Sequence, residues 1–366
     1  MNIAIYHPNL NHFGGGETVA LTIASALSKA HKVDIITHTE ADKSRLSSFF
    51  GLDLSNVNII VFKPVISSLP FPNTIMPFVL LKATYSLLEK YDVAFDTCTN
   101  GWFDKKLKCK TICYIHFPFF YPKKKGLKSI LNPYMIFPEN AFQYDKILCN
   151  SNFTKSIVSK MTGKEITVVY PPVEVENIKP AKKKLSRIVT IGRFTYEKKH
   201  EVMIDAFKEL SKTAKNYSFH LIGSFQENND LYKKDYFDML KKRADGYPIE
   251  FHINMPHEQV LRFLEESKIY WHARGYGETN PNEYENFGIT TVEAMAALCV
   301  PIVINLGAQP EIVEHGKSGY VWSDTKELVK YTSLILKNKV DSLDIIKKSK
   351  KYSKYKFLEK IEILIS

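Results

Sequence analysis

Short runs of apolar and β-branched residues alternate along this chain with longer stretches in which apolar positions recur at helical spacing. This alternation is typical of repeated strand–helix units that build a parallel sheet. In the first half of the chain, the pattern predicts helices that include residues 17–30 and 151–161. It predicts strands at residues 3–6, 33–37, 57–62, 93–96, 111–115, 146–149 and 167–170.

A proline-rich segment interrupts this rhythm after the last of these strands. Tyr170 is followed by Pro171 and Pro172, and adjacent prolines favour an extended geometry that suits a short, stiff spacer. The alternation then restarts, and the sequence from residue 326 onward is predicted to be helical. The second series of strands is predicted at residues 187–191, 218–222, 250–253, 269–272, 301–304 and 319–322.

The two series predict an α/β protein with two Rossmann-like, doubly wound domains that face each other across a cleft. We expect an N-terminal domain at residues 1–170, a linker at 171–186, a second domain at 187–340 and C-terminal helices at 341–366. Ligands of doubly wound sheets bind outside the carboxyl ends of the strands. Candidate chemistry is therefore expected in the loops that follow the strands.

The composition is that of an ordinary globular enzyme. The chain has 366 residues, of which 45% are hydrophobic and 24% charged, so it can bury a core without disulfide or metal staples. Its five cysteines include no CxxC pair, which favours a reducing compartment. The longest apolar stretch, residues 75–88, is too short for a membrane-spanning helix, and no secretory signal is visible. We therefore expect a cytoplasmic protein.

The net charge of +11 predicts an attraction to anionic partners. The lysines are dispersed and accompany no nucleic-acid-binding motif, so no nucleic-acid partner is predicted. Two interpretations stay open, namely a solvated basic surface and peripheral contact with an anionic membrane. The run from His116 to Lys128 supports the second, because it places four aromatic rings directly before four lysines.

Two loops carry candidate phosphate-binding groups. Gly14, Gly15 and Gly16 follow the first strand and open a helix, whose free N–H groups can bind an anion that approaches closely. The spacing is not that of a GxGxxG fingerprint, and a tight turn is the alternative interpretation. Arg193 and Lys198 follow the strand at 187–191, where two cations can neutralise a diphosphate. The alternative is that they are ordinary surface cations.

The segment 270–295 carries two carboxylates around a predicted helix start. Glu285 lies in the loop before the helix and Glu293 lies about one turn inside it, while the N–H groups of Gly288 and Ile289 face the same ligand. Such a loop can hold a sugar, a ribose and a phosphate together. Alternatively, Glu293 is an ordinary carboxylate near a helix N-terminus, which the dipole favours.

Together these segments resemble the signature of retaining glycosyltransferase family four, which has the GT-B fold. The resemblance includes the E-x7-E pair Glu285 and Glu293, the loop IGRFTYEKK, and the landmarks GGGE, YIHFPF, CNSNFTKSIV and YPPVEVE in order. It covers nearly the whole chain. The HPN…GGGE and YIHFP pieces are also similar to eukaryotic mannosyltransferases that extend dolichol-linked oligosaccharides.

The resemblance implies a role for each matching residue. Arg193 and Lys198 would bind the donor diphosphate, Glu285 the hydroxyls of the transferred sugar, and Glu293 the ribose. His116 would lie near the reacting sugar. The remaining donor-binding residues would be Gly15, Gly16, Asn286, Phe287, Gly288 and Ile289.

The resemblance further implies that the first domain binds the acceptor and the second the donor, and that the C-terminal helices cross back to the first domain. One departure lies at the end of the helix that carries Glu293. The family usually has glycine after Met-Ala-Ala, whereas here Ala297 is followed by Leu298.

The implied reaction moves a sugar from a GDP- or UDP-linked donor, with mannose as one candidate, to a glycan or lipid-linked acceptor with retention. Retention usually needs a nucleophilic carboxylate, and none can be named from the sequence. In this family the leaving phosphate is thought to deprotonate the acceptor instead. No cofactor and no metal are expected, because the sequence has no DxD motif and no His/Cys cluster with ligand spacing. A nucleotide-sugar epimerase and a non-catalytic nucleotide-sugar-binding module remain the alternatives.

Overall fold

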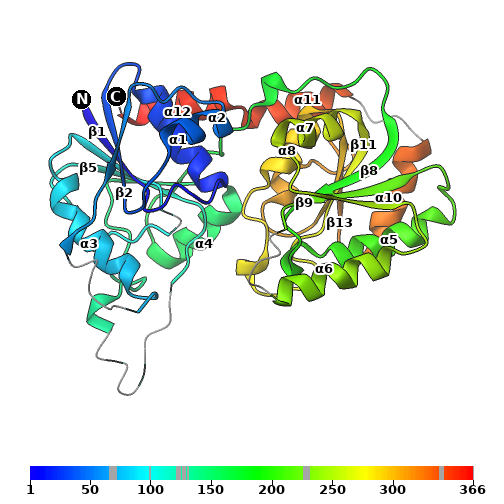
Figure 1. Ribbon diagram of the computed structural model, residues 1–366, viewed down its shortest axis with the longest axis horizontal. Coiled ribbons are helices and arrows are strands. Elements are labelled where there is room, and N and C mark those ends of the chain that lie inside the picture. Colours follow the sequence, from blue (N-terminus) through cyan, green and yellow to red (C-terminus); the bar gives the residue numbers. More distant parts are fainter. Residues whose placement is uncertain are drawn as a thin grey trace. The chain divides into compact units, whose positions relative to one another are not determined.

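The computed structural model describes residues 1–65, 72–98, 100–120, 125, 129, 132–225, 231–337 and 342–365, with no side-chain detail for residues 231–233. Within these ranges the chain divides into two compact units (Figure 1). Unit 1 comprises Met1–Pro172 and Tyr355–Ser366, and unit 2 comprises Val173–Lys354. Each unit is built around its own parallel sheet.

Unit 1 contains a seven-stranded sheet in the order β3-β2-β1-β4-β5-β6-β7. Every strand pair is parallel. Because neighbours on both sides of β1 are reached by crossovers, the sheet is doubly wound. Its strands are β1 (Asn2–Tyr6), β2 (Lys32–Thr37), β3 (Val57–Val61), β4 (Val93–Asp96), β5 (Lys110–Ile115), β6 (Lys146–Cys149) and β7 (Thr167–Val168). Its main helices are α1 (Gly15–Leu27), α2 (Lys43–Phe50), α3 (Met76–Leu88) and α4 (Asn152–Thr162).

Strand β1 shows why this sheet has a core layer on each face. Side chains alternate between the two faces of a strand. Ile3 and Ile5 join one buried cluster, whereas Ala4 and Tyr6 join the other. The last helix, α12 (Lys354–Ile365), contributes to the first of these clusters through buried apolar residues such as Ile361. The C-terminal helix is thus part of the core of unit 1.

Unit 2 contains a six-stranded sheet in the order β10-β9-β8-β11-β12-β13, again with parallel pairs throughout. The strands are β8 (Leu185–Ile191), β9 (Ser218–Gly223), β10 (Ile249–Ile253), β11 (Ser267–His272), β12 (Val300–Ile304) and β13 (Tyr320–Trp322). The helices are α5 (His200–Ser211), α6 (Leu231–Ala244), α7 (His257–Glu266), α8 (Ile289–Ala296), α9 (Gln309–Ile312), α10 (Thr325–Lys337) and α11 (Ser342–Ser349).

Two buried tryptophans fix the end of β11 in this second sheet. Trp271 donates from its indole N–H to Thr332 of α10 at 3.0 Å, and Trp322 donates to the carbonyl of His272 at 3.2 Å. A buried indole needs such a partner for its N–H. These bonds hold the end of β11, from which the candidate site begins.

The predicted fold class is confirmed, with two Rossmann-like domains of seven and six parallel strands. Each predicted strand is present, and its ends lie within two residues of the predicted ends. Across the part of the chain that the structure describes, no helix has both the length and the apolar character needed to cross a membrane.

Candidate functional site

Charged side chains converge at the carboxyl ends of β8 and β11 in unit 2. Lys198 donates from its ammonium group to Oε2 of Glu285 at 2.8 Å. His272, the last residue of β11, places Nε2 3.3 Å from the same oxygen, and a guanidinium nitrogen of Arg274 lies 3.5 Å from Oε1. The structure thus brings together two of the predicted site residues, Lys198 and Glu285.

The surroundings of Glu285 keep its carboxylate ionised. Burial by itself raises the pKa of Glu285, but the charge of Lys198 and the contacts with His272 and Arg274 outweigh burial and hold the pKa well below its usual value. A buried carboxylate that is held this way has a defined position and charge. It can therefore orient a ligand's hydroxyl groups.

The loop after β8 places Lys198 with little freedom. The lysine stem packs against Gly192, where an added Cβ would lie 3.2 Å from Cδ of Lys198. The lysine side chain is 18% exposed. Arg193 differs, because its side chain is 65% exposed and pairs with Glu197 at 3.3 Å. The two predicted diphosphate-binding cations thus have unlike environments, one enclosed and one at the surface.

The start of α8 is clamped by Gln309, a residue that the sequence interpretation missed. Gly288, the N-cap residue, has φ +110°, which favours glycine, and an added Cβ would lie 2.3 Å from the side-chain nitrogen of Gln309. This amide donates to the carbonyl of Phe287 at 2.8 Å and accepts from Thr291 at 2.9 Å. The clamp leaves the first N–H groups of α8, including that of Ile289, at the strand end.

Glu293 lies in the following turn of α8 with its carboxylate buried. Burial raises the pKa of Glu293, and exposed His257, 3.6 Å away, offsets this in part. Asn286, in the loop before α8, has a buried Oδ1 without a hydrogen-bond partner among the described residues. A buried polar group without a partner needs an explanation, and a bound ligand is one.

Leu298, which stands where the family usually has glycine, follows the end of α8. Leu298 has φ +53°, in the left-handed region that favours glycine. Its N–H bonds the carbonyl of Met295 at 3.0 Å, and the N–H of Cys299 bonds that of Ala294 at 2.8 Å. These two bonds form a Schellman motif, whose C′ residue is usually glycine. Leucine here carries the backbone strain that glycine would avoid.

Substitution of Leu298 tests this strain directly. We expect Leu298→Gly to be more stable than Leu298→Ala by about 1 kcal/mol, because both lack the leucine side chain but only alanine keeps the Cβ penalty. Urea unfolding followed by circular dichroism measures the difference. Equal stability of the two variants would contradict the strain argument.

Unit 1 holds a second group of predicted residues, around the start of α1. Gly14 is the N-cap, and the carboxylate of Glu17 accepts from its N–H at 2.9 Å. His7 lies 3.4 Å from Glu17 and 2.9 Å from Thr97. Burial raises the pKa of Glu17, but the contact with His7 and backbone N–H groups lower it to about 2. The helix start thus already contains one fixed negative charge.

His116 and Gly16 are neighbours beside this helix start. An added Cβ on Gly16 would lie 3.8 Å from Nε2 of His116, an ordinary van der Waals distance. Packing within the protein therefore does not demand glycine here, whereas close approach of a ligand would. Nε2 of His116 is buried without a hydrogen-bond partner in the described part of the chain. Burial lowers the pKa of His116 to about 4, helped by His7, so the ring is neutral near pH 7.

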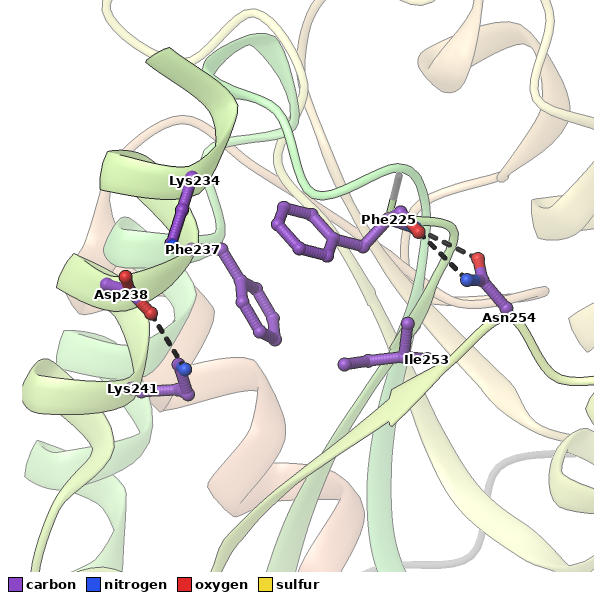
Figure 2. A pocket seen from close by; sticks show the side chains of 7 residues that line it. All are labelled: Phe225, Lys234, Phe237, Asp238, Lys241, Ile253 and Asn254. Atoms are coloured by element: carbon purple, nitrogen blue, oxygen red, sulfur yellow. Dashed lines mark hydrogen bonds and ion pairs between the residues drawn. The ribbon is translucent and has the colours of Figure 1, made fainter. Parts of the chain in front are cut away.

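A separate cavity of about 410 Å³ opens in unit 2 beside α6 and the ends of β9 and β10. Figure 2 shows Phe225 and Phe237 on its sides, Lys241 paired with Asp238, and Asn254 bonded to the backbone of Phe225. None of the predicted site residues lines this cavity, so the two are different places in unit 2. Its lining comprises Phe225, Lys234, Phe237, Asp238, Lys241, Ile253 and Asn254.

Both halves of the chain match models of known protein families. Residues 174–356 match the model described as "Glycosyl transferases group 1". Residues 13–177 match the model described as "Glycosyltransferase Family 4". The matched ranges contain nearly all of both units, including every predicted site residue.

Curated relatives are similar over part or most of their length. A GDP-Man:Man(3)GlcNAc(2)-PP-Dol alpha-1,2-mannosyltransferase of Dictyostelium discoideum is 27% identical over 54% of this chain, and the match spans 41% of that protein. The Xenopus laevis protein of the same description is 25% identical over 83% of this chain and 73% of its own length. Among solved structures, Anabaena HepE in complex with UDP and glucose has a TM-score of 0.72 at 14% identity, covering 100% of this chain and 99% of that one.

Proposed function

Because the chain belongs to the glycosyltransferases, with domains of group 1 and of family 4, we propose that it transfers mannose from GDP-mannose to a lipid-linked oligosaccharide with retention at the anomeric carbon. The curated relatives support this donor and this class of acceptor, since their descriptions name GDP-mannose and a dolichol-linked glycan. The observation that carries the proposal is the partly buried Lys198–Glu285 pair, at the strand ends and beside the clamped start of α8.

Each group near this pair suits one part of a nucleotide-diphosphate sugar. Lys198 and Arg193 offset the charge that builds on the leaving diphosphate as the glycosidic bond breaks. Glu293 accepts from ribose hydroxyls, and Glu285 accepts from hydroxyls of the transferred sugar. Asn286, Phe287, Gly288 and Ile289 present polar groups and backbone N–H groups to the donor. Lys198 shifts from Glu285 to the diphosphate when the donor binds.

The proposed roles of the unit 1 residues are less specific than those of the unit 2 residues. Gly16 and the neighbouring Gly15 are assigned to a phosphate or a sugar at the start of α1, because an added Cβ at Gly16 would meet only ordinary contacts within the protein. His116 offers to the reacting sugar its Nε2, which has no hydrogen-bond partner among the described residues. For retention, the C1–phosphate bond breaks while the acceptor oxygen bonds C1 on the same face. The acceptor proton passes to the leaving phosphate oxygen, so this step needs no protein nucleophile.

The donor is tested with purified protein and a panel of GDP-, UDP- and ADP-sugars. We expect GDP-mannose to give the largest thermal stabilisation and slow release of GDP in the absence of acceptor. A product that forms only with a lipid-linked oligosaccharide acceptor separates a transferase from an epimerase or a binding module. No acceptor-dependent product with any donor would overturn the proposal, and a preference for UDP-sugars would correct the donor.

Catalysis is expected to proceed without a divalent cation in the donor site. Lys198, Arg193 and the N-terminus of α8 supply the positive charge that Mg²⁺ supplies in other phosphate-transfer sites. After chelator treatment, the initial rate at a temperature well below unfolding should stay within about twofold of the untreated enzyme. An activity that EDTA abolishes and Mg²⁺ or Mn²⁺ restores would refute this expectation.

A lipid-linked acceptor is reached most easily by an enzyme that binds its membrane. The sequence candidate for this contact, the run from His116 to Lys128, lies largely outside the described residues, with only 116–120 and 125 described. Each lysine near an anionic surface adds about 1 kcal/mol, so weak binding that salt screens is expected. Sedimentation with anionic and neutral liposomes at low and high salt measures it. Equal binding to both liposome types would leave the lysines as ordinary surface charge.

A further inference from the structure

Three side chains on the edge strand β10 and its neighbour β9 in unit 2 form a group of metal-ligand atoms away from the donor residues. Nδ1 of His220 on β9 lies 2.9 Å from Nε2 of His252 on β10. Oε2 of Glu250, also on β10, lies 3.6 Å from the His220 nitrogen and 3.7 Å from the His252 nitrogen. The same three atoms thus close a triangle.

The strand register explains why these residues meet. His220 pairs directly with Glu250 across the parallel β9–β10 ladder, and His252 lies two residues further along β10. Residues two apart on a strand share one face of the sheet. Phe263 of α7 covers this face, with its ring centroid 5.6 Å from that of His220 and 4.6 Å from that of His252.

We propose that His220, Glu250 and His252 bind a zinc ion. Two imidazoles and one carboxylate are a ligand set that zinc uses, with bonds of about 2.0–2.2 Å. A triangle with the three observed edges has its equidistant point about 2.0 Å from each corner, which matches those bond lengths. The distances among the three atoms therefore already suit the ion.

The surroundings of the His220 ring suit a metal ligand. Nε2 of His220 lies 2.8 Å from Oγ of Ser218, an oxygen that can accept the second ring N–H and so fix the ring's orientation, which is what a hydrogen-bond acceptor does for a metal-binding histidine.

The charges nearby leave the site open to a cation. Arg187 is a neighbouring positive group, but it pairs with Glu266 at 3.0 Å and stacks over Phe263. The carboxylate of Glu250 is 62% exposed, so solvent reaches the metal position and can complete the coordination. His220 lies three residues before the end of β9, set back from the strand ends where the donor residues gather. A zinc ion here would fasten the edge strand β10 to β9 and not take part in sugar transfer.

The test titrates chelator-treated, full-length protein with ZnCl₂ by calorimetry and follows its Tm. We expect one zinc per chain and a Tm rise of about 5–10 °C when free zinc exceeds Kd about a hundredfold. His252→Ala and Glu250→Gln are each expected to weaken binding at least about tenfold, since even loss of an outer-shell partner costs that much. Glu258→Gln, an exposed glutamate on α7, is the matched control and should bind zinc as the wild type does.

His252→Ala and Glu250→Gln are chosen so that a loss of zinc binding can be told from unfolding. His220 is buried and its replacement can unfold the sheet, whereas Glu250 is exposed and Gln preserves its shape. Absence of stoichiometric zinc binding in the wild type would overturn the proposal. So would unchanged binding in both His252→Ala and Glu250→Gln, which would leave the pair as hydrogen-bonded structural histidines. Neither outcome bears on GDP-mannose binding, which is measured separately.

Discussion

Replacing Lys198 by methionine is expected to lower kcat/KM for sugar transfer by about a hundredfold or more. A charge contact that strengthens on a developing anion in an enclosed site is worth about 2–4 kcal/mol of transition-state stabilisation. The Lys198 side chain is 18% exposed and already contacts a carboxylate of the site. Methionine keeps the apolar stem that packs against Gly192, so the substitution isolates the loss of charge from the loss of packing.

The same change at Arg193 is expected to cost much less, about tenfold at most. The sequence assigns both cations to the diphosphate, but the structure gives them different surroundings. The Arg193 side chain is 65% exposed and pairs with Glu197, so water screens its charge. Steady-state kinetics of Lys198→Met and Arg193→Met with GDP-mannose measure both effects, with exposed Lys212→Met as the matched control. A Lys198→Met enzyme within about threefold of wild type would contradict the assignment.

A pH profile adds a readout that a packing defect would not produce. Among the charges that lower the pKa of Glu285, that of Lys198 is the largest. In the wild type the pKa of Glu285 is held well below its usual value, so the carboxylate is charged throughout the neutral range. Without Lys198 the pKa rises, and the acid limb of the activity profile should move to higher pH.

The fold was predictable because both sheets are buried and parallel. Strands buried on both faces show as short, continuous apolar runs, and those runs are the signal that the sequence contains. The ends of the strands were predicted less accurately than their positions. Strand β7 ends at Val168, before the predicted residue 170, because its pairing with β6 extends only to Val168. Strand β11 begins at Ser267, earlier than predicted, next to an irregularity in its pairing with β8.

The candidate site was predictable only as far as it follows strand ends. Lys198 and Glu285 lie in the loops that follow β8 and β11, two neighbouring strands of one sheet, so topology brings them to one edge. Gln309 lies 22 residues from Phe287, whose carbonyl it binds, and no local pattern marks it. His220 and His252 are likewise 32 residues apart, so the absence of metal-ligand spacing in the sequence did not exclude a cluster in the fold. To predict contacts between residues that follow or lie on different strands, one must know how the strands pair, and the sequence alone does not show that register.

Replacing the two glutamates by glutamine is expected to separate donor binding from turnover. Glu293 is buried 3.6 Å from His257, and our proposal assigns its carboxylate to the ribose hydroxyls. Loss of charged hydrogen bonds costs about 1.5–3 kcal/mol, which is roughly a tenfold to hundredfold rise in the Kd for GDP. Our proposal assigns Glu285 to the sugar and not to the nucleotide, so Glu285→Gln should leave GDP affinity nearly unchanged.

Turnover, by contrast, is expected to respond to the substitution of Glu285. Glu285→Gln removes the charge that Lys198, His272 and Arg274 hold in place, so the sugar loses its orientation and kcat should fall by about a hundredfold. Calorimetry with GDP and steady-state kinetics measure the two variants, and Glu283→Gln in the same loop is the matched control. Because a glutamine at position 285 also leaves Lys198 without its carboxylate, the Tm of each variant must be compared with that of the wild type. If Glu293→Gln bound GDP as the wild type does while remaining folded, the ribose would have to be held by other groups near the start of α8. One of these is Asn286, whose Oδ1 has no hydrogen-bond partner in the part of the chain that the structure describes.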